Sequence, residues 1–192
     1  MEMRRSDYWY FNNIFTPDRC QYIIDLGLKK GFHKGTVARK KRLNTKVRKS
    51  QVCFLHNQYL FDVINTYLPT ANKSALWNYR YERIEAVQLT RYEKGDHYSW
   101  HVDSTLNPYT DPKKPNFYGK IRKISLVVPL SDPRTYKGGN FQFWSGKTLT
   151  IKEGRKQGSL LFFPSYLWHR VTPITEGIRY SLVAWICGDP FV

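Results

Sequence analysis

The sequence predicts an α+β domain in which two N-terminal helices support a jelly roll of short β-strands. Two observations carry this prediction. Apolar residues repeat at helical spacing in two segments before residue 70, whereas from about residue 82 short β-rich runs alternate with Gly, Pro and Asp. The chain of 192 residues has no Ser/Gly-rich linker and no internal repeat, which fits one domain. We therefore expect a single domain over 1–192, with a helical support and a basic mobile loop in 1–80 and the β-core in 80–192.

Local signals set the limits of the two helices. Thr16 provides an N-cap and Pro17 a proline at the first helical position, and Gly31 is the expected stop. Between them, apolar side chains lie at i, i+3, i+4 and i+8, namely Cys20, Ile23, Ile24 and Leu28. A second helix is expected over 58–68, with Pro69 ending it.

The β-rich part divides into seven expected strands, each short and bounded by turn residues. They cover residues 84–92, 121–130, 140–144, 147–151, 159–163, 169–172 and 179–186. On the last strand, alternate side chains share one face that we expect to look into the barrel: Arg179, Ser181, Val183 and Trp185. The one long connection, 104–120, is rich in proline and lysine, and loops of this length are usually functional or disordered.

The net charge of +16 is concentrated in one window of the sequence. Between Lys34 and Lys49 there are eight basic residues and no acid, so this window supplies half of the net charge. Two interpretations stay open: a solvated mobile loop, or a lid that closes over an acidic or extended substrate.

Cysteine usage and hydropathy indicate the compartment. Cys20, Cys53 and Cys187 are odd in number and show no CxxC pairing, so we expect reduced, structural thiols. There is no stretch resembling a signal peptide and no apolar run of 18 residues. We therefore expect a soluble, cytoplasmic protein.

The most specific feature of the chain is the order of its candidate metal ligands. His101 and Asp103 are two residues apart, so in an extended segment both side chains project to the same face. His169 follows 66 residues after Asp103 and can complete the set. Two imidazoles and one carboxylate in this pattern can occupy one face of an octahedral metal and leave three positions open, as in non-haem Fe(II) oxygenases.

Arg179, ten residues after His169, predicts a partner for that metal. A buried arginine needs a carboxylate, because an unpaired buried charge is costly. Few acids stand on the expected strands, whereas a bound 2-oxoglutarate would present its far carboxylate there, with the Ser181 hydroxyl as a second donor. A charge-assisted hydrogen bond of this kind contributes about 1.5–3 kcal/mol.

Other metal sites fit the sequence less well. His97 and His101 are four apart, but Tyr98 replaces the glutamate of an HExxH zinc site. A deaminase-like zinc site would need a ProCysxxCys motif, which is absent. His33 and His56 have no partner pattern, and we interpret both as structural or exposed.

The segment from Tyr92 to Asp103 resembles the Tyr-x-x-Gly-x-x-Tyr-x-x-His-x-Asp signature of prolyl 4-hydroxylases, members of the Fe(II)/2-oxoglutarate dioxygenases. Similar segments follow in order at 122–126, 136–141, 158–164, 169–174 and 177–181, with Trp185 after them. The resemblance covers about residues 80 to 190, and its short form is similar to the bacterial and phage members.

The resemblance implies a double-stranded β-helix, cupin-like, with a site for Fe(II) and 2-oxoglutarate, and ascorbate as an accessory reductant. The implied metal-binding and catalytic residues are His101, Asp103 and His169. The implied 2-oxoglutarate contacts are Arg179, Ser181 and Tyr92. Near the substrate it implies Arg122 and Trp185, and it likens Arg48-Lys49-Ser50 to the Arg-x-Ser of a mobile loop that folds over a peptide, so Arg48 joins the substrate contacts. We also expect aromatic side chains to line the pocket, namely Tyr98, Trp100, Trp168 and Trp185.

The implied activity is hydroxylation of a peptidyl substrate, with proline as the favoured residue and succinate and CO2 as co-products. A phage-encoded form would act in the host cytoplasm. Two alternatives are compatible with the basic charge: an oxygenase acting on nucleic acid, and a non-catalytic nucleic-acid-binding jelly roll. Against the first, the demethylase pattern has a second arginine six residues after the first, and here that position is Trp185.

Overall fold

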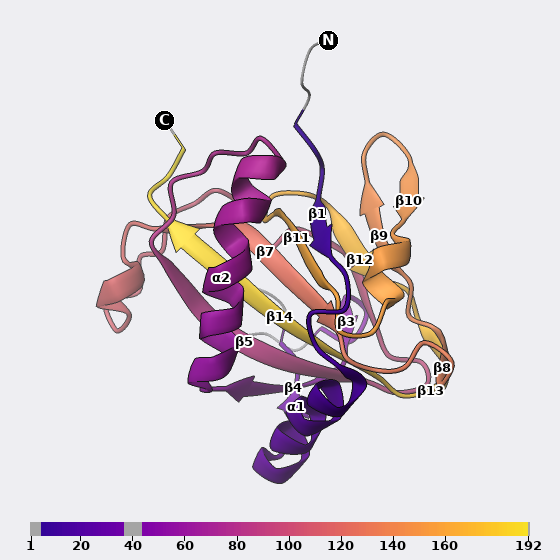
Figure 1. Ribbon diagram of the computed structural model, residues 1–192. Coiled ribbons are helices and arrows are strands. Elements are labelled where there is room, and N and C mark those ends of the chain that lie inside the picture. Colours follow the sequence, from indigo (N-terminus) through magenta and orange to yellow (C-terminus); the bar gives the residue numbers. More distant parts are fainter. Residues whose placement is uncertain (1–4, 37–43, 192) are drawn as a thin grey trace.

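In the computed structural model, which describes residues 5–36 and 44–191, the chain forms an α+β structure around two antiparallel sheets (Figure 1). The N-terminal elements are β1 (Trp9–Phe11), α1 (Pro17–Lys30), β2 (His33–Lys34), β3 (Arg48–Lys49), β4 (Gln51–Leu55) and α2 (Gln58–Ser74). The β-core follows with β5 (Arg83–Tyr92), β6 (His97–His101), β7 (Ile121–Pro129), β8 (Tyr136–Gly138), β9 (Phe141–Trp144), β10 (Thr148–Thr150), β11 (Leu160–Pro164), β12 (His169–Val171), β13 (Ile174–Gly177) and β14 (Arg179–Gly188). Two 3-10 turns cover Pro115–Phe117 and Lys152–Arg155.

The strands form a major sheet and a minor sheet that pack face to face. The major sheet has the order β1-β11-β7-β14-β5-β4-β2, the minor sheet has the order β10-β9-β12-β6-β3, and β13 pairs with β8 alone. All of these pairs are antiparallel. The arrangement is the double-stranded β-helix, so the expected fold class is confirmed.

Two apolar cores follow from this layering. One lies between the helices and the major sheet, and the other lies between the two sheets. Strand β14 contributes to both by alternation: Leu182 and Ala184 enter the helix-side core, whereas Val183 packs against the inter-sheet core. Arg179 and Ser181 share the inner side with Val183, as the two-residue period predicts.

The first helix begins and ends where its sequence predicts. The Thr16 side chain accepts a hydrogen bond from the amide of Arg19 (3.3 Å), and Gly31 follows the helix with φ 88°. The second helix is longer than expected, because it passes through Pro69 and ends at Ser74. Pro69 is exposed, whereas Leu68 and Ala71 on the same helix are buried. Packing of the apolar stripe therefore outweighs the hydrogen bond that the proline removes.

The seven expected strands are confirmed to within two residues at either end. The strands β1, β2, β3, β4, β6, β8 and β13 were not among the expected strands. The long loop 104–120 is internally braced by the 3-10 turn at Pro115–Phe117 and by a bridge between Tyr109 and Tyr118. The residues 37–43, which hold much of the basic window, lie outside the described residues, and the choice between loop and lid stays open.

Other expectations concern the surface and the thiols. Cys20, Cys53 and Cys187 are buried, and none of them forms a disulfide within the described residues. Within the described parts of the chain, no helix combines the length and apolarity needed to cross a membrane.

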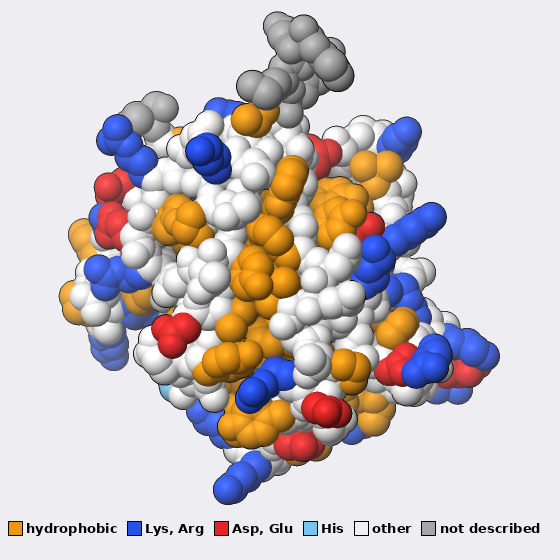
Figure 2. All heavy atoms as spheres, viewed as in Figure 1, with side chains coloured by type: hydrophobic (Ala, Val, Ile, Leu, Met, Phe, Trp, Pro, Cys, Tyr) orange, Lys and Arg blue, Asp and Glu red, His pale blue; other side chains and the backbone are white. Residues whose placement is uncertain are grey.

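On the side that α2 covers, Lys and Arg side chains are dispersed around the margin of an apolar strip and do not gather on it (Figure 2).

Candidate active site

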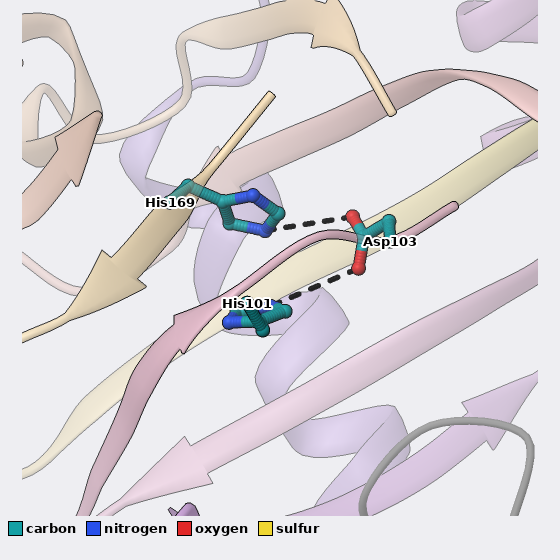
Figure 3. A group of neighbouring side chains, drawn as sticks. All are labelled: His101, Asp103 and His169. Carbon is teal, nitrogen blue, oxygen red and sulfur yellow. Dashed lines mark ion pairs between the residues drawn. The ribbon is translucent and has the colours of Figure 1, made fainter. Parts of the chain in front are cut away.

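Three side chains with metal-ligand chemistry meet between the two sheets. His101 ends β6 and His169 begins β12, and these two residues are direct partners across the strand pair. Asp103 follows β6 by two residues and turns its carboxylate toward both rings (Figure 3). One ligand atom from each residue lies within 4.8 Å of the others. The structure therefore brings together the three residues that sequence spacing had selected.

The orientation of both imidazoles is fixed by the main chain. Nδ1 of His101 lies 2.8 Å from the carbonyl oxygen of Ser99, and Nδ1 of His169 lies 2.9 Å from that of Leu167. A carbonyl only accepts, so each Nδ1 carries the proton and each Nε2 keeps its lone pair. Both Nε2 atoms face Asp103, at 3.8 Å from Oδ1 and 3.5 Å from Oδ2 respectively. A histidine that binds a metal through Nε2 requires this tautomer and this ring orientation.

The carboxylate of Asp103 is held by a pair of buried serines. The Ser125 hydroxyl on β7 donates to Oδ2 of Asp103 (2.8 Å), and its Oγ lies 2.9 Å from Oγ of Ser165. The carbonyl of Ser165 accepts from the amides of Asp103 and Ser104, both at 2.9 Å. Ser125 and Ser165 thus fix both the side chain and the backbone of Asp103, and no hydroxyl of the described residues donates to Oδ1.

Burial sets the charge states of this cluster. It lowers the pKa of His101 to about 3, with the neighbouring His169 acting in the same direction. Burial alone would raise the pKa of Asp103, but interactions with His169 and His101, the charge of Arg122 and the hydrogen bond from Ser125 outweigh it and hold that pKa below its usual value. A carboxylate beside a neutral imidazole is the donor set that binds a divalent cation without first releasing protons.

Arg179 lies deep between the sheets, and no described residue offers it an acidic partner. Its side chain is 1% exposed, and Nη1 donates to Oγ of Ser181 at 3.0 Å. Its Nε and Nη2 are buried and have no hydrogen-bond partner among the described residues. Tyr92 is its partner across β5 and β14, with the Tyr92 ring 5.6 Å from the guanidinium carbon. A buried cation with two unused donors is arranged for an anion that the protein itself does not supply.

Arg122 and Trp185 form a second group at the same site. The guanidinium carbon of Arg122 lies 3.9 Å from the centroid of the Trp185 ring, and its Nη1 is 3.5 Å from the carbonyl oxygen of Asp103. Nε of Arg122 donates to Glu85 at 2.6 Å, and the Tyr109 hydroxyl donates to the same carboxylate at 2.8 Å. Glu85 therefore holds Arg122 against the indole of Trp185, and through its hydrogen bond with Tyr109 it also connects the loop 104–120 to the site. The indole Nε1 of Trp185 is buried without a partner among the described residues.

Arg48 lies near the site, but its guanidinium is held by neighbouring protein groups. It is buried, its Nε donates to Oγ of Ser50 (2.9 Å), and its Nη1 donates to the carbonyl of Thr36 (3.2 Å). Its guanidinium carbon lies 4.6 Å from the centroid of the Tyr98 ring, which in turn stacks on His101 at 3.4 Å between centroids. Arg48 thus supports a metal-ligand histidine through an aromatic ring.

Two of the four aromatic residues expected in the pocket lie elsewhere. Tyr98 and Trp185 are at the site, but Trp100 and Trp168 are on the opposite side of the minor sheet. Trp100 contacts Arg170, and Trp168 is 49% exposed. The reason is alternation, because each of these tryptophans directly precedes an inward-facing histidine. His33 and His56 are exposed, as expected.

Sequence reasoning missed the residues that hold the ligands in place, namely Ser125, Ser165 and Glu85. Serine and glutamate are common, and each of these contacts spans at least 22 positions along the chain. The available signal was a polar residue between apolar neighbours in a buried strand, since Ser125 lies between Ile124 and Leu126 and all three are buried. Such a residue in a buried strand needs a partner.

Comparison with known proteins agrees with this geometry. A family model described as the 2OG-Fe(II) oxygenase superfamily matches residues 87–187. A PKHD-type hydroxylase from Synechococcus sp. (strain CC9902) is 33% identical over 109 residues, which cover 54% of this chain and 42% of the relative. A PKHD-type hydroxylase from Pseudoalteromonas atlantica is 31% identical over 110 residues, with 54% and 44% covered. The chain spans less than half the length of these curated relatives.

Solved structures share the fold over nearly the whole chain. The viral collagen prolyl hydroxylase of Paramecium bursaria chlorella virus-1, in complex with 2OG, superposes with a TM-score of 0.70 at 22% identity, covering 95% of this chain and 97% of the other. A prolyl-4-hydroxylase from Pseudomonas putida gives 0.71 at 16% identity, with 93% and 91% covered. A prolyl hydroxylase from Trichoplax adhaerens, in complex with a hypoxia inducible factor peptide fragment, gives 0.65 at 19% identity, with 94% and 83% covered.

Proposed function

Since this chain belongs to the 2OG-Fe(II) oxygenase superfamily, with Fe(II) and 2-oxoglutarate as its cofactors, we propose that it hydroxylates a peptidyl substrate and that the residue oxidised is proline. The observation that carries the oxygenase part is the convergence of His101, Asp103 and His169 beside a buried arginine with two unused donors. Proline is supported by the names of the structural neighbours, which are prolyl hydroxylases.

The metal would be held by His101, Asp103 and His169. Their donor atoms fit a divalent cation, because two neutral imidazole Nε2 atoms and one carboxylate already converge within 4.8 Å. When bound, Fe(II) and 2-oxoglutarate supply with O2 the oxidising chemistry for C–H hydroxylation, releasing succinate and CO2. The protein contributes fixed ligands and a buried setting between the two sheets.

The far carboxylate of 2-oxoglutarate would pair with Arg179. Its Nε and Nη2 offer two parallel donors, the geometry in which a guanidinium binds a carboxylate. Ser181 holds the remaining Nη1 in place, and Tyr92 packs beside the guanidinium. These three residues therefore select a dicarboxylate and orient it relative to the metal ligands.

The peptide would be oriented by Arg122 and Trp185. Glu85 and the indole keep the Arg122 guanidinium in one position next to Asp103, and the free indole N–H can donate to a peptide carbonyl. We assign Tyr98 and Arg48 an indirect part, since Tyr98 stacks on His101 and Arg48 braces Tyr98 from behind.

The direct test is to incubate the chain with Fe(II), 2-oxoglutarate and a set of proline-containing peptides, and to look for the mass gain of one oxygen atom by mass spectrometry. Each peptide is paired with a version in which alanine replaces proline. Gain on proline peptides alone, with matching succinate, is the expected result. Succinate formation with oxidation of an oligonucleotide and of no peptide would overturn the peptidyl assignment while leaving the oxygenase assignment intact.

A further inference from the structure

The outer face of the minor sheet carries an exposed group of three tryptophans and one arginine that the oxygenase reaction does not use. We call it the tryptophan face and define it by Trp100, Trp144, Trp168 and Arg170. Strand β12 pairs with β6 on one side and β9 on the other, with His169 opposite both His101 and Phe143. These three side chains point inward, so their neighbours along the strands point outward.

The members of the tryptophan face contact one another. The guanidinium carbon of Arg170 lies 4.5 Å from the Trp100 ring centroid, and its Nε donates to Oε1 of Gln142 at 2.7 Å. The Trp100 and Trp144 rings meet edge to face at 6.3 Å. The amide of Trp144 donates to the carbonyl of Trp168, which places these two residues opposite each other on adjacent strands. Trp144 and Trp168 are nonetheless 48% and 49% exposed, so the rings offer open surface held in a fixed arrangement.

The charge of this surface has one sign. The five strands of the minor sheet contain no Asp or Glu. Arg170 makes no ion pair within the described residues, whereas Arg122 and Arg91 each have a glutamate. Lys147 is exposed in the turn between β9 and β10, and Lys46 is exposed beside β6, where its carbonyl lies 3.3 Å from Oγ of Ser99. The face therefore combines aromatic rings with cations for which the described part of the chain supplies no ion pair.

We propose that the tryptophan face binds single-stranded nucleic acid. Bases stack on exposed aromatic rings whatever their sequence, and phosphates pair with neighbouring cations, so one ligand satisfies both features of the surface. A second copy of the chain is a poor occupant, because each copy carries a net charge of +16. A neutral proline-rich peptide would cover the rings but leave the cations without partners. This binding is separate from the proposed hydroxylation, which takes place on the inner side of the same strands.

The probe is a fluorescein-labelled oligothymidylate of about 12 nucleotides, titrated with the full chain and followed by anisotropy. If three cations meet phosphates, affinity should fall about 20-fold between about 50 and 200 mM salt. Trp144→Ala should weaken binding about 5–150-fold, the range for one stacked base. Arg170→Gln should lower the slope of log affinity against log salt by about 0.7. Quenching of tryptophan fluorescence in the unchanged protein gives a readout that needs no variant.

A matched cation–aromatic pair on the helical side serves as the control. The guanidinium carbon of Arg19 lies 4.8 Å from the Tyr59 ring centroid, and Tyr59 is 42% exposed. Tyr59→Ala and Arg19→Gln remove an equivalent ring and an equivalent charge, and both should leave oligonucleotide affinity unchanged. Peptide hydroxylation should persist in all four variants, which also shows that they are folded.

Three results would overturn the proposal. The first is no oligonucleotide binding and no tryptophan quenching by the unchanged protein. The second is an equal loss of affinity in the control variants, which would reduce the binding to general charge attraction. The third is salt-insensitive binding of a neutral proline-rich peptide to the tryptophan face without oligonucleotide binding, which would make it a peptide-docking surface. None of these results bears on the hydroxylase proposal, which is tested by its own mass-spectrometric measurement.

Discussion

The two faces of the minor sheet are built from the same strands and have opposite characters. On the inner face, His101 and His169 lie against a buried carboxylate, and every one of the three ligands has a hydrogen bond that fixes it. On the outer face, Trp100 and Arg170, each the direct neighbour of one of those histidines, contact each other and are partly exposed, and Arg170 has no acidic partner among the described residues. Alternation along a strand thus separates a preorganised buried site from an open surface by one residue.

The difference lies in how each face treats its polar groups. On the inner face, burying a polar group without a hydrogen-bond partner costs free energy, so most polar side chains there have a partner. The exceptions, such as Nε and Nη2 of Arg179, point to a ligand. Outside, water satisfies what the protein does not. Substitutions on the inner face should therefore change chemistry, while adjacent substitutions on the outer face should not.

The largest contrast is expected between neighbouring residues of β12. His169→Ala removes a metal ligand and should abolish succinate formation from 2-oxoglutarate, with or without peptide, because the remaining two side chains cannot complete the ligand set. Arg170→Gln should leave that rate unchanged and shift the free energy of unfolding by less than about 0.5 kcal/mol. Succinate release and thermal unfolding measure the two effects. Unimpaired turnover in the His169 variant would contradict the claim that only substitutions on the inner face change the chemistry.

A second effect should appear at the anion pocket. Arg179→Gln removes the charge that pairs with 2-oxoglutarate, and the loss of about 1.5–3 kcal/mol corresponds to a KM for 2-oxoglutarate raised roughly 10–150-fold. Metal affinity should not change, because the guanidinium does not contact the three ligands. Arg179→Lys keeps the positive charge but not the two parallel donors of the guanidinium, so its KM for 2-oxoglutarate should lie between those of the unchanged protein and Arg179→Gln. An equal loss in metal affinity would show that Arg179 acts on the fold of the site and not on the cosubstrate.

Ser125 tests whether the hydroxyl pair positions Asp103. Ser125→Ala removes the donor to Oδ2 and should weaken metal binding about 10–100-fold, the usual effect of losing a hydrogen bond to a ligand. The matched control is Ser159→Ala, since Ser159 is also fully buried but its hydroxyl has no partner among the described residues. Competition titrations with Co(II) measure both proteins without requiring turnover. Similar losses in the two variants would mean that volume matters here and hydrogen bonding does not.

The smallest effect concerns acid stability. The pKa of Glu85 lies below its ordinary value, because attraction to Arg122 and hydrogen bonds outweigh the burial that would raise it. A carboxylate with a depressed folded-state pKa adds stability above its unfolded-state pKa, here about 4.3, and that stability is lost as the pH falls through the folded-state value. Glu85→Gln should therefore flatten the fall in unfolding free energy below about pH 4.3. Denaturant titrations at several pH values measure it, and an unaltered acid limb would contradict the assignment.

Much of the fold follows from local patterns. The cap at Thr16, the stop at Gly31 and the alternation along 179–185 all act through residues close in sequence, and each was confirmed. Pro69 was misjudged because its cost is local, whereas the packing of Leu68 and Ala71 that offsets it comes from the sheet. Short strands such as 33–34 and 48–49 were missed because two residues carry no period.

The site divides in the same way. Residue type and order in the sequence pointed to His101, Asp103, His169 and Arg179, and the structure places all four between the two sheets. Ser125, Ser165 and Glu85 depend on which strands become neighbours, and that information lies in the register of the sheets. The tryptophans at 100 and 168 were placed wrongly for a related reason: an aromatic next to a ligand lies on the opposite face whenever the strand continues.

The pairing of His101 with His169 also determines which changes in chain length the protein tolerates. Strand β6 already holds one extra residue between Tyr98 and His101, which lets both side chains face inward, so a further insertion or deletion there would turn the imidazole away from the metal site. The same change in the turn at 145–147 alters only the connection between the edge strand β10 and its neighbour β9. Lineages of this chain can therefore vary in length at that hairpin, whereas β6 can change its outward residues only by substitution.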